Sequence, residues 1–199
     1  MPKVVDHEAR RRELAEAVWR IVRRDGIDHA SVRAVAAESG WSSGSLRHYF
    51  PTQDSLLGFA MQMAFRRLFT RLEQIDTTRP HREITRRIAH ELLALDEERE
   101  TESAVLISFV PRALVEPGLH ELERTGTHAL YDRFAAVFRQ ARDAGELEPG
   151  LDPAKEARRT VALIDGLNLH HQQGAEDMPH DDMIAIVEEH LDRLFPRAD

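Results

Sequence analysis

Residues 31–57 restrict the possible folds of this chain more than any other stretch. Their sequence, SVRAVAAESGWSSGSLRHYFPTQDSLL, predicts two short helices around a tight turn, followed by a proline and the start of a long helix. Ser31 is placed to cap a first helix over residues 32–39, and Gly40 ends that helix.

The second short helix is capped by Ser42 and has to stop at Phe50, because Pro51 disfavours a helical conformation in the residue before it. Two helices of about two turns each, joined by a turn that contains glycine, make a helix-turn-helix, in which the second helix enters the DNA major groove. An ordinary helical hairpin on the surface of an all-α protein would have the same local pattern.

The second helix has one apolar side and one polar side. With Leu46 turned inward and about 100° of rotation per residue, Gly44 and His48 lie on the opposite face, with Ser45 and Arg47 on its flanks. Arg47 can form a fork of hydrogen bonds to a guanine edge or bind a phosphate. The outer face is therefore rich in hydrogen-bond donors.

The start of the same helix suits an anionic partner. Gly44 has no side chain and lets the helix N-terminus come close to a phosphate, where free N–H groups attract an anion. Four further side chains can donate to a DNA backbone: Ser43, Ser45, His48 and Tyr49.

The segment GWSSGSLRHYF, residues 40–50, followed by PTQDSLL, resembles the signature of the TetR family of one-component bacterial transcriptional regulators. The turn glycine, the glycine of the second helix, the His-Tyr-Phe triplet and the following leucine pair all stand at matching spacing. The resemblance implies a set of DNA-binding residues: Ser31, Arg33, Ser42, Ser43, Gly44, Ser45, Arg47, His48, Tyr49 and Gln53.

Four positions depart from the pattern of that family. Trp41 replaces a smaller aliphatic residue, and Ser43 and Gln53 stand where lysine is frequent. Arg47 stands where tyrosine is frequent. Two charged contacts to phosphate are thereby lost and one is gained, so Arg47 is the residue expected to carry operator preference.

Composition places the chain among globular proteins, with 42% hydrophobic and 31% charged residues. It has no cysteine, which excludes disulfides and thiolate metal sites. Residues 1–50 contain 9 Lys and Arg against 7 Asp and Glu, whereas residues 51–199 contain 18 against 28. A slightly basic head on an acidic body is expected if only the head meets phosphate. The start of the chain lacks a signal peptide and no run approaches 18 apolar residues, which predicts a cytoplasmic protein without a membrane partner.

Apolar residues recur at helical spacing along the whole chain, and no strand pattern is present. The sequence predicts an all-α fold of about nine helices: a three-helix head, residues 1–51, and a helical-bundle regulatory domain, residues 52–199. The core of the head is predicted to contain Val18, Ile21, Val22, Val35, Leu46 and Phe50. The predicted helices cover about 9–25, 32–39, 43–50, 52–76, 84–95, 102–115, 117–144, 153–173 and from 179 to the C-terminus, and Pro111 is expected to kink or split the sixth.

The body also resembles the regulatory domain of the TetR family, through VEPGLHEL, GELEPGLDP and TVALIDGLNL. The resemblance implies that the last two helices pair with their copies in a second subunit as a four-helix bundle. Gly166 would allow a partner helix to come close, or would instead ease a contact within the chain. The predicted subunit interface contains Val161, Ile164, Gly166, Leu167, Ile184, Val187, Leu191 and Leu194.

A helical body around Pro111 can leave a cavity for a small molecule. The candidate ligand-binding residues combine aromatic walls with a few polar groups, although each could instead be plain core or surface. They are Phe59, Met63, Phe109, Arg112, Tyr131, Asp165 and Asn168. An anionic or polar ligand would suit Arg112.

Catalytic and metal-binding motifs are not found. His90-Glu91 lacks the second histidine of a zinc-protease helix, and His170 and His171 diverge by about 100° on a helix, so neither pattern predicts a metal. Gly-x-Ser-x-Gly and glycine-rich phosphate loops are missing too, and no cofactor is predicted.

The sequence thus predicts a homodimeric transcriptional regulator, a repressor that binds a double-stranded DNA operator and responds to a small-molecule effector. It is not expected to be an enzyme. The alternative is a helical-bundle enzyme or small-molecule carrier in which the helix-turn-helix is purely structural.

Overall fold

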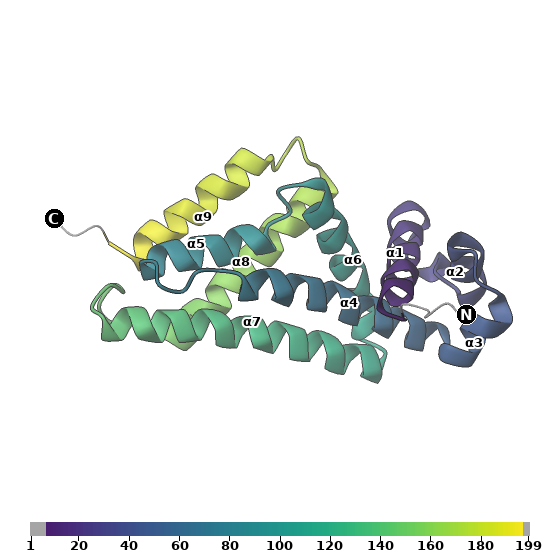
Figure 1. Ribbon diagram of the computed structural model, residues 1–199. Helices are drawn as coiled ribbons and strands as arrows, with labels where there is room; N and C mark the ends of the chain where they lie inside the picture. Colours follow the sequence, from purple (N-terminus) through teal and green to yellow (C-terminus); the bar gives the residue numbers. More distant parts are fainter. Residues whose placement is uncertain (1–6, 197–199) are drawn as a thin grey trace. The chain divides into compact units, whose positions relative to one another are not determined.

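The computed structural model describes residues 7–196, and this part of the chain contains helices and loops but no strand. No helix within it combines the length and the apolar character needed to cross a bilayer. The all-α prediction of about nine helices is confirmed (Figure 1). The elements are α1 (His7–Asp25), the 3-10 helix η1 (Ile27–His29), α2 (Val32–Ser39), α3 (Ser43–Tyr49), α4 (Gln53–Glu73), α5 (His81–Leu92), α6 (Glu97–Ala113), α7 (Pro117–Asp143), α8 (Pro153–Gln173) and α9 (His180–Leu194).

The helices form two compact units, each with its own hydrophobic core. The first unit contains the chain up to Arg67 together with Ala104–Arg124, and the second contains Leu68–Ser103 together with the chain from Thr125 onward. This division differs from the predicted boundary after residue 51, because the first part of α4 and parts of α6 and α7 share the core of α1–α3. A functional boundary at residue 51 stays a prediction.

The core of the first unit is built on α1, α2 and α3. Val18, Val35 and Leu46 are fully buried, as the sequence predicts. Phe50 is only half-buried, and its ring lies 5.1 Å from the ring of Phe59 in α4. Leu46 therefore is the residue that anchors α3 to the head.

Hydroxyl caps and one glycine set the limits of the two short helices. The Ser31 Oγ accepts a hydrogen bond from the Ala34 N–H at 3.2 Å, and the Ser42 Oγ accepts one from the Ser45 N–H at 3.0 Å. Gly40 ends α2 with a φ of 72°, a left-handed conformation that glycine adopts without strain. The caps and the turn agree with the sequence prediction.

Pro111 does not split α6, so this part of the prediction is wrong, whereas a kink at Pro111 stays a prediction. The helix starts at Glu97, five residues before the expected Glu102, and continues through Pro111 to Ala113. Pro111 lies in the last turn, where its missing N–H removes one hydrogen bond close to the helix end, so the helix is not divided.

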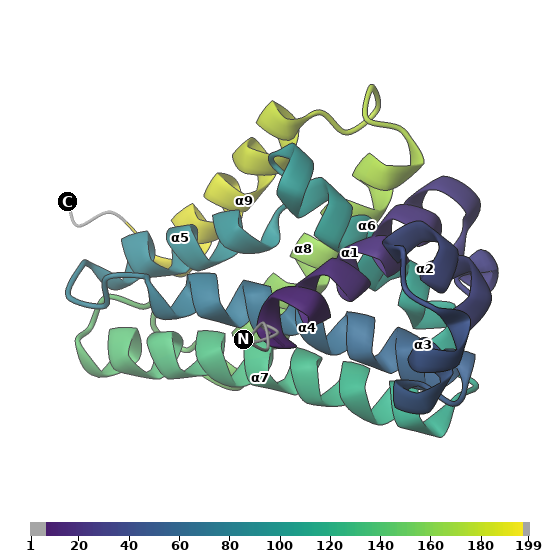
Figure 2. The same ribbon diagram turned by 45° about the vertical axis from the view of Figure 1, so that its right-hand side comes forward.

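The second unit contains α5, α8 and α9 with parts of α4, α6 and α7. Figures 1 and 2 both show α5 beside α9, and the Arg82 guanidinium of α5 binds the carboxylates of Glu188 and Asp192 in α9, each at 2.7 Å. Phe134 and Phe138 of α7 fill the middle of the core and are fully buried. Asp152 caps α8 by accepting hydrogen bonds from the N–H groups of its first turn.

Candidate nucleic-acid interface

Helix α3 presents nearly all of its side chains to solvent. Leu46 is 0% exposed, whereas Gly44, Ser45, Arg47 and His48 are all exposed. A single buried leucine therefore fixes the rotation of the helix and directs the other positions outward. This exposed ridge has the rotation predicted from the sequence, and its contact with DNA stays a prediction.

Gly44 faces open space. A Cβ atom built at this position would meet no other atom within 4 Å, and the backbone has no positive φ that would demand glycine. Neither internal packing nor backbone conformation therefore explains a glycine here. Close approach of a partner to the helix backbone at Gly44 stays a prediction.

Arg47 and Arg33 are the exposed cations on and beside the ridge. Within the part of the chain that the structure describes, neither has a hydrogen-bond or ion-pair partner. By contrast, the Arg20 guanidinium donates to the Glu38 carboxylate at 2.8 Å, which lowers the pKa of Glu38. Arg47 is thus free to bind an outside acceptor, and a guanidinium suits a guanine edge or a phosphate.

Gln53 is removed from the candidate DNA-contact set. Its side-chain nitrogen donates to the backbone carbonyls of Ile27 and Asp28 at 3.4 and 3.3 Å. The donor that a phosphate contact would require is therefore engaged in holding η1 against the start of α4.

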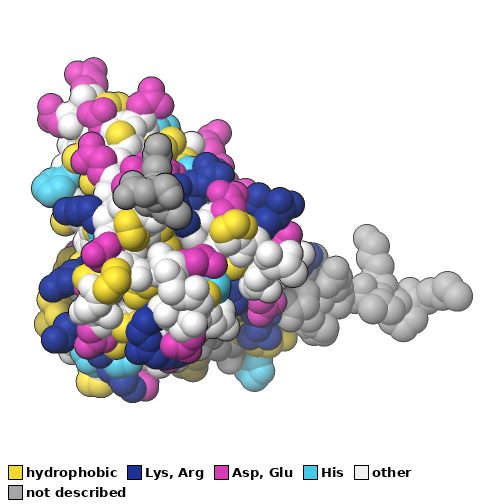
Figure 3. Space-filling view, turned by 90° about the vertical axis from the view of Figure 1, so that its left-hand side faces the viewer, with side chains coloured by type: hydrophobic (Ala, Val, Ile, Leu, Met, Phe, Trp, Pro, Cys, Tyr) yellow, Lys and Arg dark blue, Asp and Glu magenta, His cyan; other side chains and the backbone are white. Residues whose placement is uncertain are grey.

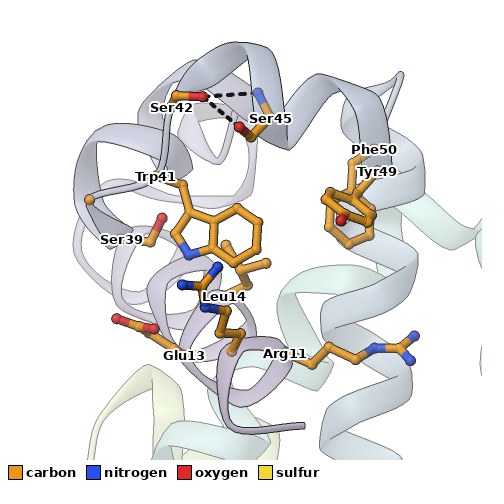
Figure 4. Close-up of a pocket in the computed structure, with 11 residues that line it drawn as sticks. Arg11, Glu13, Leu14, Ser39, Trp41, Ser42, Ser45, Tyr49 and Phe50 are labelled. Carbon is orange, nitrogen blue, oxygen red and sulfur yellow. Dashed lines mark hydrogen bonds between the residues drawn. The ribbon is translucent and has the colours of Figure 1, made fainter. Parts of the chain in front are cut away.

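A groove of about 820 Å³ lies beside α3, and Trp41 points into it from the turn after α2 (Figure 4). The Arg10 guanidinium lies 5.4 Å from the centre of the Trp41 ring, and the Tyr49 ring meets Trp41 edge-on at 6.1 Å. Trp41, one of the four residues that depart from the family pattern, thus joins α1 to the end of α3. Its large ring supports Tyr49, which is 61% exposed and belongs to the predicted DNA-contact set.

Charge is distributed differently in the second unit. Asp181 and Asp182 are exposed at the start of α9, and Lys155 and Arg158 are exposed near the start of α8. Figure 3 shows acidic and basic side chains mixed over one face of the molecule, with acidic ones gathered toward its upper end. A mixed surface of this kind is not typical of a phosphate-binding region.

Four of the seven predicted ligand-binding residues lie in the first unit, where they have structural roles. Phe59, Met63 and Phe109 are buried in its hydrophobic core. The Arg112 guanidinium donates to Asp54 at 2.9 Å, which raises the pKa of Arg112. An anionic ligand would have to compete with that carboxylate, so the assignment of Arg112 is corrected to an intrachain ion pair.

The other three predicted ligand-binding residues lie in the second unit and do not form one site. The Asn168 side chain accepts from the Ala94 N–H and donates to the Leu92 carbonyl, both at 2.9 Å, so it closes the end of α5. Asp165 is exposed, and Tyr131 is half-buried beneath the guanidinium of Arg158. These three side chains therefore have different surroundings and different partners.

A second groove, of about 430 Å³, lies in the first unit and includes Phe59 but none of the other six candidates. The Arg11 guanidinium lies 5.4 Å from the centre of the Phe59 ring at this groove. The predicted ligand set therefore does not converge on either of these two grooves.

Six of the eight predicted subunit-interface residues belong to the core of the protomer, and their assignment to the interface is wrong. All six are at most 4% exposed, because α8 and α9 pack against each other and against α5 and α7. Ile184 and Gly166 remain partly exposed. The six core residues are Val161, Ile164, Leu167, Val187, Leu191 and Leu194.

The exposed faces of α8 and α9 are made by other residues. On α8, Ala162, Asp165 and Leu169 follow one another at helical spacing, and Leu169 is 40% exposed. On α9, Ala185 and Glu189 are exposed. Of these positions, Ala162, Asp165, Ala185 and Glu189 are small or polar and give little apolar signal in the sequence.

Comparison with known proteins adds an independent observation. Residues 81–196 match the family described as BetI-type transcriptional repressor, C-terminal. The chain belongs to the TetR family of transcriptional regulators. As a member of that family it regulates transcription through its helix-turn-helix and is not an enzyme.

Relatives of this TetR-family chain match it over almost its full length. The HTH-type transcriptional regulator PksA of Bacillus subtilis (strain 168) is 31% identical over 196 residues, which cover 98% of this chain and 94% of PksA. The HTH-type transcriptional regulator BetI of Pseudomonas fluorescens is 29% identical over 198 residues, covering 96% of each chain.

Solved structures share the fold. A transcriptional regulator from Rhodococcus sp. Rha1 superimposes with a TM-score of 0.84 at 26% identity, covering 92% of this chain and 95% of the other. A regulator from Saccharomonospora viridis, solved in complex with choline, gives a TM-score of 0.83 at 23% identity, covering 96% of this chain and 100% of the other.

Proposed function

We propose that this TetR-family regulator is a cytoplasmic repressor that binds a near-palindromic operator as a homodimer through α3. Two copies of α3 would enter successive major grooves about 34–36 Å apart. The exposed ridge of Gly44, Ser45, Arg47 and His48, held by the single buried Leu46, is the observation that supports this proposal most strongly.

A mobility-shift assay on DNA upstream of the protein's own gene tests the DNA-binding part. Binding should be specific and should weaken as salt rises, because phosphate contacts release counterions. Arg47→Ala should weaken specific binding, whereas Arg139→Ala, which removes an exposed arginine from α7 in the second unit, should not. Equal binding of specific and unrelated DNA would overturn the proposal.

The second unit is proposed to bind the effector. Helix α4 starts next to α3 and continues past Arg67 into the second unit, so one rigid element connects the two functions. An effector that releases the operator must prefer one arrangement of the heads, typically by about 1–3 kcal/mol. The choline complex of the Saccharomonospora viridis regulator gives the first compound to test. Choline should lower operator affinity by about 5- to 150-fold if it is the effector, and an unchanged affinity would exclude choline.

Dimerisation is proposed to use the exposed faces of α8 and α9. Ala162 and Ala185 have small side chains that would let partner helices approach closely. Ala162→Glu should shift the protein toward monomer in analytical ultracentrifugation while leaving its helical content unchanged. Sedimentation of the wild-type chain as a monomer at micromolar concentration would contradict this part of the proposal.

A further inference from the structure

Three potential metal ligands from three helices meet in the second unit. They are Glu100 in α6, His171 near the end of α8 and His180 at the start of α9. One ligand atom from each lies within 4.8 Å of the other two. The sequence pattern predicts no metal here, because His170 and His171 point in different directions on a helix. The partners of His171 come from distant parts of the chain, which a local pattern does not indicate.

The spacing of these atoms is close to that of a first coordination sphere. The Glu100 Oε1 lies 3.2 Å from the His180 Nε2 and 3.6 Å from the His171 Nε2. Ligands of a tetrahedral Zn²⁺ ion, bound at about 2.0–2.2 Å, lie about 3.3–3.6 Å apart. The two imidazole nitrogens lie within 4.8 Å of each other.

The tautomer of His171 suits a metal. Its Nδ1 lies 2.8 Å from the Met178 carbonyl oxygen, which can only accept a hydrogen bond, so Nδ1 carries the proton. The neutral ring then has a lone pair on Nε2, which faces the Glu100 carboxylate. A backbone carbonyl that orients an imidazole in this way is typical of metal-binding histidines.

The Nε2 of His180 is buried and has no hydrogen-bond partner among the described residues. Although the Glu100 Oε1 is only 3.2 Å away, the pair lacks the geometry of a hydrogen bond. A buried polar nitrogen without a partner is energetically costly, and a cation between the three ligand atoms would satisfy it.

The two imidazole rings of the cluster lie close to each other. The His171 and His180 rings lie 4.7 Å apart with an angle of 34° between their planes. Two imidazoles and one carboxylate are a usual donor set for one divalent transition-metal ion.

We propose that Glu100, His171 and His180 bind a divalent transition-metal ion such as Zn²⁺, with the remaining coordination positions open to water. Imidazole and carboxylate donors favour Zn²⁺, Co²⁺ or Ni²⁺ over Mg²⁺ and Ca²⁺. The ion would fasten the start of α6 to the corner between α8 and α9, and would stabilise the second unit. This site is independent of the proposed effector and of DNA binding.

The test uses the full chain without an affinity tag, stripped with a chelator and titrated with Zn²⁺ by calorimetry and thermal unfolding. One ion should bind per chain and raise the unfolding temperature. Glu100→Gln and His180→Gln should each weaken binding at least about tenfold. His170→Gln, which changes the exposed neighbour of His171, should bind as the wild type does.

Two results would overturn the proposal. One is no stoichiometric binding of Zn²⁺, Co²⁺ or Ni²⁺ by the folded wild-type chain. The other is equal binding by wild type, Glu100→Gln and His180→Gln, which would mean that the ion binds elsewhere on the surface. Comparison of circular dichroism spectra establishes that each variant is folded before its affinity is measured.

Discussion

Helices α3 and α8 expose their side chains in opposite ways. α3 buries one residue, Leu46, and turns its other six to solvent. α8 buries nine of its 21 residues, among them Ile164, and exposes small and polar residues such as Ala162. α3 therefore contributes little to the core of its own unit, and most of its surface is accessible to a partner. The apolar residues of α8 instead pack inside the protomer.

The largest effect is expected where α8 supports the core. Ile164→Ala should lower the free energy of unfolding by about 2–5 kcal/mol, because it leaves a cavity at a site that is 2% exposed. Urea unfolding at several protein concentrations measures it. Ala162→Ser, on the exposed face, is the control and should change stability by less than about 0.5 kcal/mol. If Ile164→Ala abolished the dimer but left the protomer fully stable, Ile164 would lie in the subunit interface after all.

The next effect concerns His190, which joins α9 to α8. The Thr160 hydroxyl donates its only proton to the Glu156 carbonyl, so it accepts a hydrogen bond from the His190 Nε2. Burial, together with the nearby Arg193 and Arg159, lowers the pKa of His190 to about 4. The folded protein therefore keeps this ring neutral where the unfolded chain, with a pKa of about 6.5, takes up a proton.

Stability should consequently fall as pH drops from about 6.5 to about 4, by on the order of 3 kcal/mol from this residue. His190→Gln retains a donor for Thr160 and removes the titration, so the variant should lose less stability over that window. Burial also lowers the pKa of His90, which acts in the same direction in both proteins, so the difference between their pH profiles isolates His190. Identical profiles would contradict the assignment.

A smaller effect is expected at the cap of α3. Ser42→Ala should cost about 1 kcal/mol, because the Ser45 N–H loses its acceptor. Ser43→Ala changes the neighbouring exposed serine, which caps nothing, and should be close to neutral. A loss of stability in Ser42→Ala alone would show that the effect comes from the cap and not from removal of a hydroxyl in general. Equal unfolding curves for the two variants would contradict the role of Ser42 as the cap of α3.

The smallest change in stability is expected for a substitution at Gly44, which separates the stability of α3 from its binding to DNA. Gly44→Ala should stabilise the protein by up to about 1 kcal/mol, since alanine favours a helix and its Cβ meets nothing within 4 Å. The same substitution should weaken operator binding if DNA approaches the backbone there. Thermal unfolding and mobility shift measure the two quantities, and a Gly44→Ala variant with unchanged affinity would remove Gly44 from the interface.

The sequence predicts α3 well because its pattern leaves little choice. A cap, one leucine and a proline after the helix determine its limits and its rotation, and Leu46 is buried as expected. The packing of the long helices is harder to predict. Apolar residues on several faces of a helix indicate that these faces are buried, but not whether they pack within the protomer or against a second subunit. Six of the eight predicted interface residues of α8 and α9 therefore belong to the core.

Contacts between distant residues could not be predicted from local patterns. Gln53 was assigned to phosphate from its position in the motif, but its amide reaches back to the carbonyls of η1. The meeting of Glu100 with His171 and His180 depends on how α6, α8 and α9 pack. No periodicity within one helix contains that information.

Cleavage of DNA from a single attached reagent tests the central claim about α3 most directly. The chain has no cysteine, so His48→Cys provides one thiol for an iron-chelate cleavage reagent, and Arg139→Cys provides the control in α7. The reagent at position 48 should cut the operator at two places about 10–10.5 base pairs apart, one for each recognition helix, while the reagent at position 139 should leave the DNA intact. Cleavage from position 139 and none from position 48 would contradict the placement of α3 in the major groove.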